Sequence, residues 1–332
     1  MCQGTFASHS KQGLIGSMRS LLCSGNWGDI RENTVAQLFC DWTDFTSTST
    51  PVNMSTPAKS TATGFVGIGL VGLADDLGVK LNNGRPGAMG GPDAFRQSLA
   101  RYGTRNIPLF SGGLPRLVDF GNVVAATTSS DLQQDLKRTH QHIFQIVQFI
   151  LSHRLFPIGI GGGHDLTLPM VRGVVDFFGQ PFVGAYLDAH LDVRATIGSG
   201  MPFRILLEEK IVTELSCAGL DCFANSVDHQ KWFTENGGKL SPAADIDWQD
   251  LDFVSLDLDV IDSAHAPGVS APNPNGMNPN QIAKIVNLCG KSQRLKYFDI
   301  MEFCPPFDLD NRTGRLAAHL FCQFLAGWSS RI

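Results

Sequence analysis

The sequence carries no excess of positive charge and no long apolar run. Its 332 residues include 26 lysines and arginines and 31 aspartates and glutamates, for a formal net charge of −5. Nucleic-acid-binding proteins and proteins that bind anionic membrane surfaces present a basic patch, which this balance disfavours. No apolar run approaches the ~18 residues that a membrane span requires. We therefore expect a small-molecule partner, and neither a nucleic acid nor a membrane.

Paired cysteines and an apolar signal core are also missing. The eight cysteines are scattered along the chain, and no two of them form a Cys-x-x-Cys pair. This distribution favours reduced thiols over a disulfide framework. We expect a cytoplasmic protein. A mitochondrial leader is the alternative, because the first forty residues contain few acidic side chains.

Composition divides the chain into two regions. Residues 1–63 form an N-terminal extension, and its last part, residues 44–63, is rich in Ser, Thr, Pro and Ala, which is typical of a surface loop or linker. Within the extension, Leu21, Leu22 and Trp27 could form a helix that packs on the rest of the protein. We expect residues 64–332 to fold as one α/β domain, because their length and apolar content suffice for a buried core.

Strand-like and helix-like segments alternate through this domain. The patterns predict strands at 64–70, 156–160, 182–187, 214–220, 253–258 and 295–301, and helices at 92–102, 132–152, 166–178, 226–236, 279–288 and 312–328. Such alternation is typical of a parallel sheet with helices on both faces. Three histidines on or beside the long helix, His140, His142 and His153, are predicted to be solvated.

Three of the predicted strands end in short blocks of metal-ligand side chains. Alternate side chains of an extended segment point the same way, so the spacing of Asp188, His190 and Asp192 predicts that they converge. Ligands commonly bind at the carboxyl ends of the strands in open α/β sheets. The three blocks, residues 161–164, 188–192 and 255–259, together supply His164, Asp188, His190, Asp192, Asp257 and Asp259.

This set of side chains favours two divalent cations. One imidazole per ion with a majority of carboxylate oxygens suits manganese, whereas structural zinc sites prefer thiolates and imidazoles. Two metal ions ~3.5–4 Å apart can share and deprotonate one water, so we expect a hydrolase. A single Asp-x-Asp is more often a helix cap or a turn, but six such residues at three strand ends are costly to desolvate without cations.

The same blocks resemble the signatures of the arginase family of ureohydrolases, which includes arginases, agmatinases and formimidoylglutamases. Asp299-Ile-Met-Glu302 is similar to a fourth shared block, and the likeness runs from about residue 64 to the C-terminus. The resemblance implies a three-layer α/β/α sandwich with a mostly parallel central sheet, two Mn²⁺ ions per subunit, and a homo-oligomer, either a trimer or a hexamer. It also implies that one ion is held by His164 and Asp192 and the other by His190 and Asp259, with Asp188 and Asp257 shared by both.

Within the family, finer features resemble the formimidoylglutamase branch. They are residues 78–88, the triplet 192–194, residues 198–204 and the ending 313–318. Arginases and agmatinases place a histidine in the loop after the second motif, and Phe203 stands in that region here. The resemblance implies substrate contacts for Arg194, Ser199, Arg204 and Arg85. Because guanidinium groups pair well with carboxylates, a dicarboxylate amidine is the expected substrate. Arg85 has a second interpretation, a structural role in a turn between two glycines.

The resemblance therefore implies hydrolysis of N-formimidoyl-L-glutamate to L-glutamate and formamide, a step of histidine degradation. Glu302 would hold the amidinium nitrogen, and Asp192 would pass a proton to the departing amine. Two alternatives stay open. An agmatinase-type or arginase-type guanidino hydrolase would share the whole metal site. A non-catalytic binding protein of this fold would be expected to lose some of the six ligands, and all six are present.

Overall fold

A mostly parallel β-sheet forms the centre of the protein. The computed structural model describes residues 18–29, 35–48, 64–103, 116–126 and 130–331. In these residues the strands follow the order β1-β4-β3-β5-β10-β9-β6-β7-β8, with β2 also paired to β4, and every pairing except β1 with β4 is parallel. The strands are β1 (Leu22–Cys23), β2 (Phe39–Asp41), β3 (Gly67–Leu73), β4 (Arg116–Val123), β5 (Leu155–Gly161), β6 (Phe182–Leu187), β7 (Val212–Ala218), β8 (Gly238–Leu240), β9 (Phe253–Asp257) and β10 (Tyr297–Met301).

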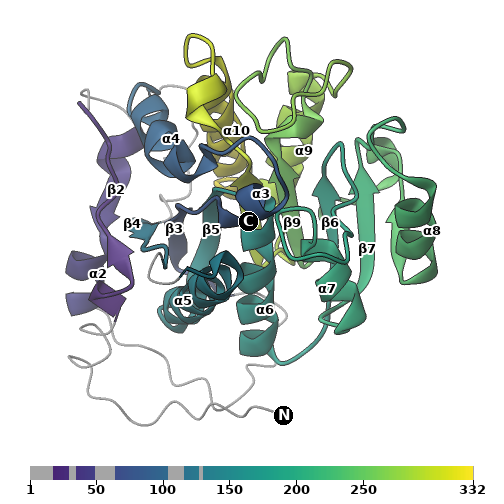
Figure 1. Ribbon diagram of the computed structural model, residues 1–332. Helices are drawn as coiled ribbons and strands as arrows, with labels where there is room; N and C mark the ends of the chain where they lie inside the picture. Colours follow the sequence, from purple (N-terminus) through teal and green to yellow (C-terminus); the bar gives the residue numbers. More distant parts are fainter. Residues whose placement is uncertain (1–17, 30–34, 49–63, 104–115, 127–129, 332) are drawn as a thin grey trace.

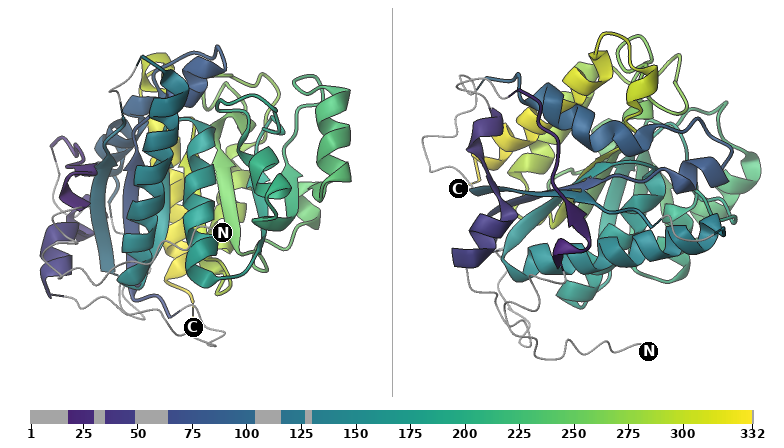
Figure 2. Two further views of the ribbon diagram at one scale, coloured as in Figure 1. Left: turned by 60° about the horizontal axis from the view of Figure 1, so that its bottom comes forward. Right: turned by 60° about the vertical axis from the view of Figure 1, so that its left-hand side comes forward.

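Helices cover both faces of the sheet. Figures 1 and 2 show α5, α6 and α7 on one side and α4, α9 and α10 on the other, which makes three layers. The predicted α/β/α sandwich is confirmed. The helices are α2 (Trp42–Thr48), α3 (Leu77–Leu81), α4 (Gly91–Leu99), α5 (Leu132–Ser152), α6 (Thr167–Phe178), α7 (Pro202–Glu208), α8 (Val227–Glu235), α9 (Pro279–Lys291) and α10 (Arg312–Trp328). Among the described residues, none of these helices combines the length and the apolar character that a membrane crossing needs.

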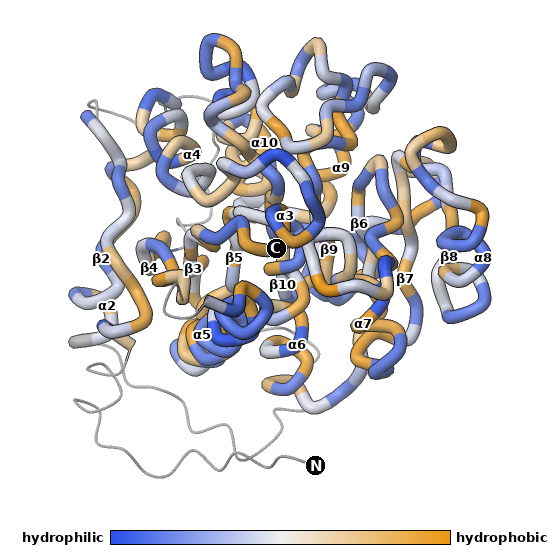
Figure 3. The backbone as a smooth tube through the Cα atoms, in the orientation of Figure 1, coloured by the Kyte–Doolittle hydropathy of each residue, from blue (hydrophilic) through white to orange (hydrophobic). Residues whose placement is uncertain are grey.

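The helix α5 shows how the sequence builds one of the covering layers. Asp131 caps its first turn, because the carboxylate accepts hydrogen bonds from the backbone N–H groups of Gln133 and Gln134. Leu136, Ile143 and other apolar residues recur on one face and are buried, whereas the opposite face is hydrophilic. The hydropathy colouring in Figure 3 shows this mixture of hydrophobic and hydrophilic positions along α5.

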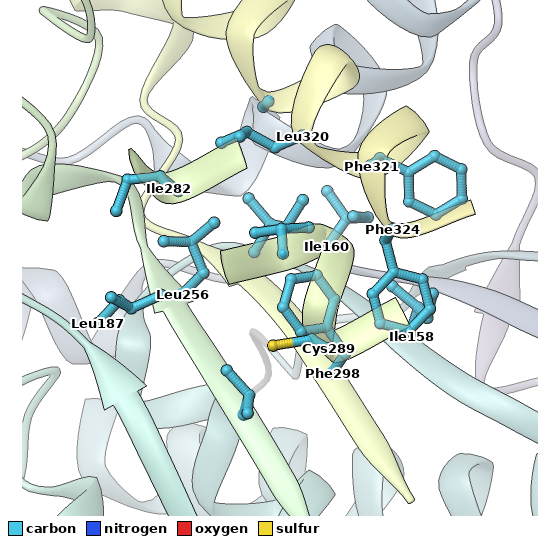
Figure 4. Packing of buried hydrophobic residues seen from close by; sticks show 14 of the residues in the cluster. Ile158, Ile160, Leu187, Leu256, Ile282, Cys289, Phe298, Leu320, Phe321 and Phe324 are labelled. Carbon is cyan, nitrogen blue, oxygen red and sulfur yellow. The ribbon is translucent and has the colours of Figure 1, made fainter. Parts of the chain in front are cut away.

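Each face of the sheet has its own hydrophobic core. Under α9 and α10, strand residues such as Ile158, Leu256 and Phe298 pack against Ile282 and Phe324 of the helices, as Figure 4 shows. A second core lies between the other face and the helices α5, α6 and α7. Because both faces are covered, the central strands are apolar on both sides, which explains the unbroken apolar runs in the sequence.

Several predicted elements have the observed bounds, and others differ. The ranges of α5, β6 and α10 coincide with the prediction, whereas β3 and β10 begin later and β7 begins earlier than expected. Four elements of the described residues after residue 63, α3, β4, α7 and β8, were missed. The strand β4 did not look like a buried strand because it contains Asp119, whose carboxylate is nevertheless buried against Arg96 of α4 at 2.8 Å.

The N-terminal extension contributes to the sheet. Leu22 lies in β1 and not in the helix that the sequence had suggested, although its side chain is buried on the domain. Residues 44–48, predicted as part of the linker, belong to α2, because Phe45 and Thr46 are buried there. The rest of the predicted linker, residues 49–63, and most of the possible leader lie outside the described residues. The boundary at residue 64 stays a prediction.

Candidate metal centre

The four strands β5, β10, β9 and β6 lie side by side and end at the same edge of the sheet. Their pairing is parallel, with Met301 opposite Asp257 and Leu187 opposite Leu256. The ligand blocks follow directly on these strands, so chain segments more than a hundred residues apart meet at one place. The structure therefore brings the predicted ligand side chains together at the strand ends.

Four of the six predicted ligands form one group. The Nδ1 atom of His164 lies 3.1 Å from a carboxylate oxygen of each of Asp188, Asp192 and Asp257. All four residues offer one ligand atom within 4.8 Å of one another. This spacing suits a single cation surrounded by one nitrogen and three oxygens.

A second group lies beside the first and shares one aspartate with it. It consists of Asp188, His190 and Asp259, and the Nδ1 atom of His190 is 3.0 Å from Asp259 and 3.4 Å from Asp188. Asp188 therefore has one oxygen toward each group. His164 and Asp192 fall in one group and His190 and Asp259 in the other, and Asp188 belongs to both, which is the arrangement that the prediction described. That these residues bind metal ions stays a prediction. Asp257 is grouped with the first set alone, so its bridging role stays a prediction.

Residues 188–192 adopt a backbone conformation that differs from the predicted one. Residues 188–192 do not form an extended segment whose alternate side chains converge on one point. The chain bends, because the backbone N–H of His190 donates to Asp188 at 2.6 Å and Asp192 adopts a left-handed conformation with φ 47°. The bend directs Asp192 to the first group and His190 to the second.

The state of the donor atoms fits a site that holds cations. Among the described residues, Nδ1 of His164 and Oδ2 of Asp188 are buried without a hydrogen-bond partner. Burial raises the pKa of Asp188 and of Asp257 above the usual carboxylate range, and repulsion from neighbouring aspartates, Asp259 among them for both, raises it further. A divalent cation would satisfy the unpartnered atoms and offset the repulsion, so the residues fit a metal.

A buried hydrogen-bond chain fixes the imidazole of His164. Its Nε2 atom is 2.9 Å from Oγ of Ser255, and that hydroxyl donates to Asp299 of β10. Asp299 also accepts hydrogen bonds from Thr167 and Tyr297. Since the Ser255 proton points to a carboxylate, its oxygen must accept from Nε2–H of His164. The lone pair of the ring is then on Nδ1, the atom that faces the three aspartates.

Glu302 follows β10 and reaches the same edge. Its Oε1 atom accepts from the backbone N–H of His164 at 2.8 Å, and its Oε2 atom accepts from the hydroxyl of Ser270 at 2.7 Å. Burial raises the pKa of Glu302 well above its usual value. Its backbone is left-handed, with φ 65°. The side chain thus lies beside the metal ligands, where the prediction placed it.

A cavity of about 170 Å³ opens over the two groups. Its walls include Asp192, Glu302 and two of the predicted substrate contacts, Arg194 and Ser199. Asn82 lines it as well and joins these contacts, since it accepts from Arg194 at 3.3 Å and donates to Ser199 at 3.2 Å. Predicted metal ligands, the two predicted catalytic residues and two predicted substrate contacts therefore line one cavity.

Arg85 and Arg204 are engaged elsewhere and are not in the lining of this cavity. Arg85 donates to the backbone oxygens of Val269 and Ser270 and lies 4.0 Å over the ring of Phe307. Arg204 pairs with Glu208 and stacks on an aromatic ring. Neither predicted substrate contact is supported by the geometry. By holding residues 269–270, Arg85 places the Ser270 hydroxyl that donates to Glu302.

Phe203 is fully buried behind the metal ligands and does not line the cavity. Its ring contacts the edge of His164 at 5.1 Å between centroids and stacks on Tyr186 at 3.7 Å. The hydroxyl of Tyr186 donates to the backbone oxygen of Leu191, inside the second ligand block. The aromatic pair therefore packs against the imidazole of His164 and holds the backbone of the second ligand block.

Two of the histidines predicted to be solvated have buried partners. His140 lies 2.9 Å from the buried carboxylate of Asp165, and His153 is 4% exposed and contacts the backbone oxygen of Phe149. The prediction was wrong for both. It assumed that the polar face of α5 points to water throughout. The loop that carries His164 covers that face at His140, and Phe45 of α2 packs on the ring of His153 at the other end of the helix.

Sequence reasoning missed several residues of the site. Ser255 and Asp299 stand within the motifs that were recognised, so their proximity to ligands was a usable signal. Asn82 also lies in a recognised motif. For Ser270 and His229, which line the cavity through loop and helix packing, the sequence contains no comparable signal.

Comparison with known proteins agrees with this geometry. A sequence model of the arginase family matches residues 66–327. The chain is 34% identical to formimidoylglutamase of Salmonella typhi over 281 residues, which cover 79% of this chain and 85% of that protein. Its structure is similar to formiminoglutamase of Trypanosoma cruzi with Mn²⁺, with a TM-score of 0.70 and 26% identity over 84% of this chain and 97% of that one. Formimidoylglutamase of Bacillus subtilis shares the fold, with a TM-score of 0.72, 23% identity, and coverage of 95% and 98%.

Proposed function

The chain belongs to the arginase family, and from that premise we propose that it hydrolyses N-formimidoyl-L-glutamate to L-glutamate and formamide with two Mn²⁺ ions. The first support is the identity to a curated formimidoylglutamase over most of both chains. The second is the site itself, because all six ligands meet in two adjoining groups. A non-catalytic protein of this fold would have no need to keep the complete set.

One observation supports this substrate in particular. The cavity has acidic ligands at its base and Arg194 in its wall. Among the described residues that line it, Arg194 alone carries a permanent positive charge. A substrate with a carboxylate on the side away from the metals gains a charge-assisted hydrogen bond there, whereas a cationic guanidino substrate such as agmatine would be repelled.

The metal ions would be held by the two groups already described. His164, Asp188, Asp192 and Asp257 would bind one ion, and Asp188, His190 and Asp259 the other. Their oxygen-rich composition supports manganese over zinc. When bound, two such ions lower the pKa of a shared water, so that hydroxide is present at neutral pH.

The side chains around the ions would bind the substrate and move its protons. Glu302 would accept a hydrogen bond from the amidinium nitrogen and so hold the formimino carbon above the metal ligands. Water adds to that carbon, and the bond from the carbon to the glutamate nitrogen breaks. The departing nitrogen takes up a proton, which Asp192 could carry from the attacking water because it is half-buried at the cavity wall.

The proposal is tested by metal content and by product identity. Protein purified with manganese should contain two ions per chain by elemental analysis, and it should release formamide from formimidoylglutamate but little urea from arginine or agmatine. Asp257→Ala should abolish turnover, since the first group loses one of its three carboxylates. Asp247→Ala is the matched control, because that aspartate is exposed, belongs to neither ligand group and does not line the cavity. Unchanged turnover in Asp257→Ala would contradict the metal assignment.

Arg194 separates this proposal from the guanidino hydrolase alternative. Arg194→Ala should raise the KM for formimidoylglutamate about tenfold to a hundredfold, the range for a hydrogen bond to a charged group. The manganese content should not change, because Arg194 is not a ligand. A guanidino hydrolase predicts the reverse, improved use of agmatine with no penalty on formimidoylglutamate.

The cytoplasmic location and the assembly into a trimer or hexamer stay proposals that rest on the sequence. Cell fractionation tests the first. Light scattering of the purified protein tests the second, and a monomer at micromolar concentration would contradict it.

A further inference from the structure

His229 lies in the wall of the metal cavity, on the first turn of α8. Its side chain is half-buried, and among the described residues its ring has no hydrogen-bond partner. The backbone N–H of His229 donates to Ser226, which caps the helix, so the main chain is fixed while the imidazole is available.

The start of α8 is tied to the second ligand block. Asn225 accepts a hydrogen bond from the backbone N–H of Leu191 at 2.9 Å and donates to the backbone oxygens of Ala189 and Asp221 at 2.8 Å. These bonds place the first turn of α8 against residues 189–191, which hold the second metal group. His229 is therefore positioned at the mouth by the same segment that carries His190.

The charges of the cavity leave one part of the expected substrate without a partner. A dicarboxylate has two anionic groups, and Arg194 is suited to one of them. The aspartates and Glu302 that line the base repel the other. Asn82 already bonds both Ser199 and Arg194. Among the described lining residues outside the two ligand groups, the imidazole of His229 is the one group besides Arg194 that can both donate a hydrogen bond and carry positive charge.

We propose that His229 is a specificity-determining residue that donates a hydrogen bond to the second carboxylate of a dicarboxylate amidine, while Arg194 binds the first. The inference rests on the proposed function, because it identifies how that substrate is selected. Two separate donors, from the loop after His190 and from α8, would require a substrate with two anionic groups at the correct separation.

Two truncated substrates test this division. N-formimidoyl-4-aminobutyrate lacks the α-carboxylate of formimidoylglutamate, and N-formimidoyl-2-aminobutyrate lacks the γ-carboxylate. His229→Ala should lower kcat/KM for the full substrate about tenfold to a hundredfold, chiefly through KM. For one truncated substrate the same variant should change kcat/KM less than threefold, since the carboxylate that His229 binds is already missing. Arg194→Ala should behave in the same way with the other truncated substrate.

Conservative and control variants separate recognition from stability. His229→Gln keeps an N–H donor and should recover part of the loss, whereas His229→Glu should be worse than His229→Ala for the full substrate. Gln230→Ala, on the next, exposed position of α8, should match the wild type. The inference is overturned if His229→Ala stays within threefold of the wild type on the full substrate. It is also overturned if the same truncated substrate shows a change in kcat/KM of less than threefold for both His229→Ala and Arg194→Ala.

Binding of the product provides a readout that does not depend on turnover. Calorimetry should show that L-glutamate binds the manganese-loaded wild type and binds His229→Ala about tenfold or more weakly. If the wild type releases no formamide but binds L-glutamate in a His229-dependent manner, the proposed function fails and the dicarboxylate site stands. If the wild type hydrolyses the substrate and His229→Ala binds L-glutamate equally well, this inference alone fails.

Discussion

Ser255→Ala should weaken metal binding although Ser255 is not a ligand. The hydroxyl of Ser255 lies between Nε2 of His164 and the carboxylate of Asp299, and all three side chains are almost completely buried. The substitution removes the group that holds the ring proton on Nε2. That proton can then move to Nδ1, where three aspartates accept it, and the lone pair that a cation needs is lost.

The magnitude follows from the atoms left without partners. In Ser255→Ala, Nε2–H of His164 and Oδ1 of Asp299 lose a hydrogen bond in a space closed to water, and each such loss costs about 1–3 kcal/mol. Asp299 keeps its hydrogen bonds from Thr167 and Tyr297. We therefore expect the free energy of unfolding of the metal-free protein to fall by about 2–3 kcal/mol. The manganese affinity should fall about tenfold to a hundredfold, as for other partners of metal-bound histidines.

Thr167→Val is the matched control. It also removes a buried hydrogen bond to Asp299, at 2.7 Å, but its hydroxyl does not contact His164. Denaturant unfolding of the metal-free proteins should show a loss for both variants, about 1–2 kcal/mol for Thr167→Val. Chelator competition should show weaker manganese binding for Ser255→Ala alone. Equal manganese affinity in the two variants would refute the argument that Ser255 sets the tautomer of His164.

Three further changes test other parts of the structure. Glu302→Gln should lower kcat/KM for formimidoylglutamate by about two to three powers of ten, because it loses the charge that holds the amidinium, worth ~3–4 kcal/mol; a change below threefold would place Glu302 outside the site. Burial tends to raise the pKa of Asp252, but hydrogen bonds, led by that of Arg294, lower it below its ordinary 3.8. Because the pKa of Asp252 is lower in the folded than in the unfolded protein, its ionised carboxylate stabilises the fold at higher pH. This stabilisation is lost as the pH falls through the folded-state pKa. Asp252→Asn should therefore be less stable than the wild type at pH 7, with a difference that shrinks below about pH 4 in unfolding titrations; a constant difference would count against the pairing. His140→Leu should lower the free energy of unfolding by about 1–3 kcal/mol, because Asp165 is buried and loses its partner; an unchanged value would mean that His140 is solvated after all.

The sequence predicted what depends on neighbours along the chain. The bounds of α5 follow from its cap at Asp131 and its helical spacing of apolar residues, and β6 follows from a short apolar run between polar residues. The metal ligands were recognisable because each block stands directly after a buried strand. In all these cases the deciding interaction is local, or is set by the rule that parallel strands end at one edge.

What the sequence did not predict depends on partners far along the chain. Asp119 is buried in β4 because Arg96, 23 residues earlier, donates to both of its oxygens. Ser255 and Asp299 meet because β9 and β10 pair in one particular register, across 44 residues. His229 reaches the cavity because Asn225 bonds to the ligand block. A pattern within a window of the sequence contains none of these pairings.

The backbone conformation of the two predicted catalytic residues was likewise not predictable from the sequence. Asp192 and Glu302 are both left-handed, a conformation that costs a residue with a Cβ about 1–2 kcal/mol and that no sequence pattern favoured here. Specific hydrogen bonds maintain it, since Glu302 donates its backbone N–H to Gly162 and Asp192 accepts from the N–H of Phe203. Glycine would remove the strain at either position, but it would also remove the carboxylate. At both positions the chain turns back at a strand end, and the left-handed backbone, held by these hydrogen bonds, brings both carboxylates to the wall of the cavity.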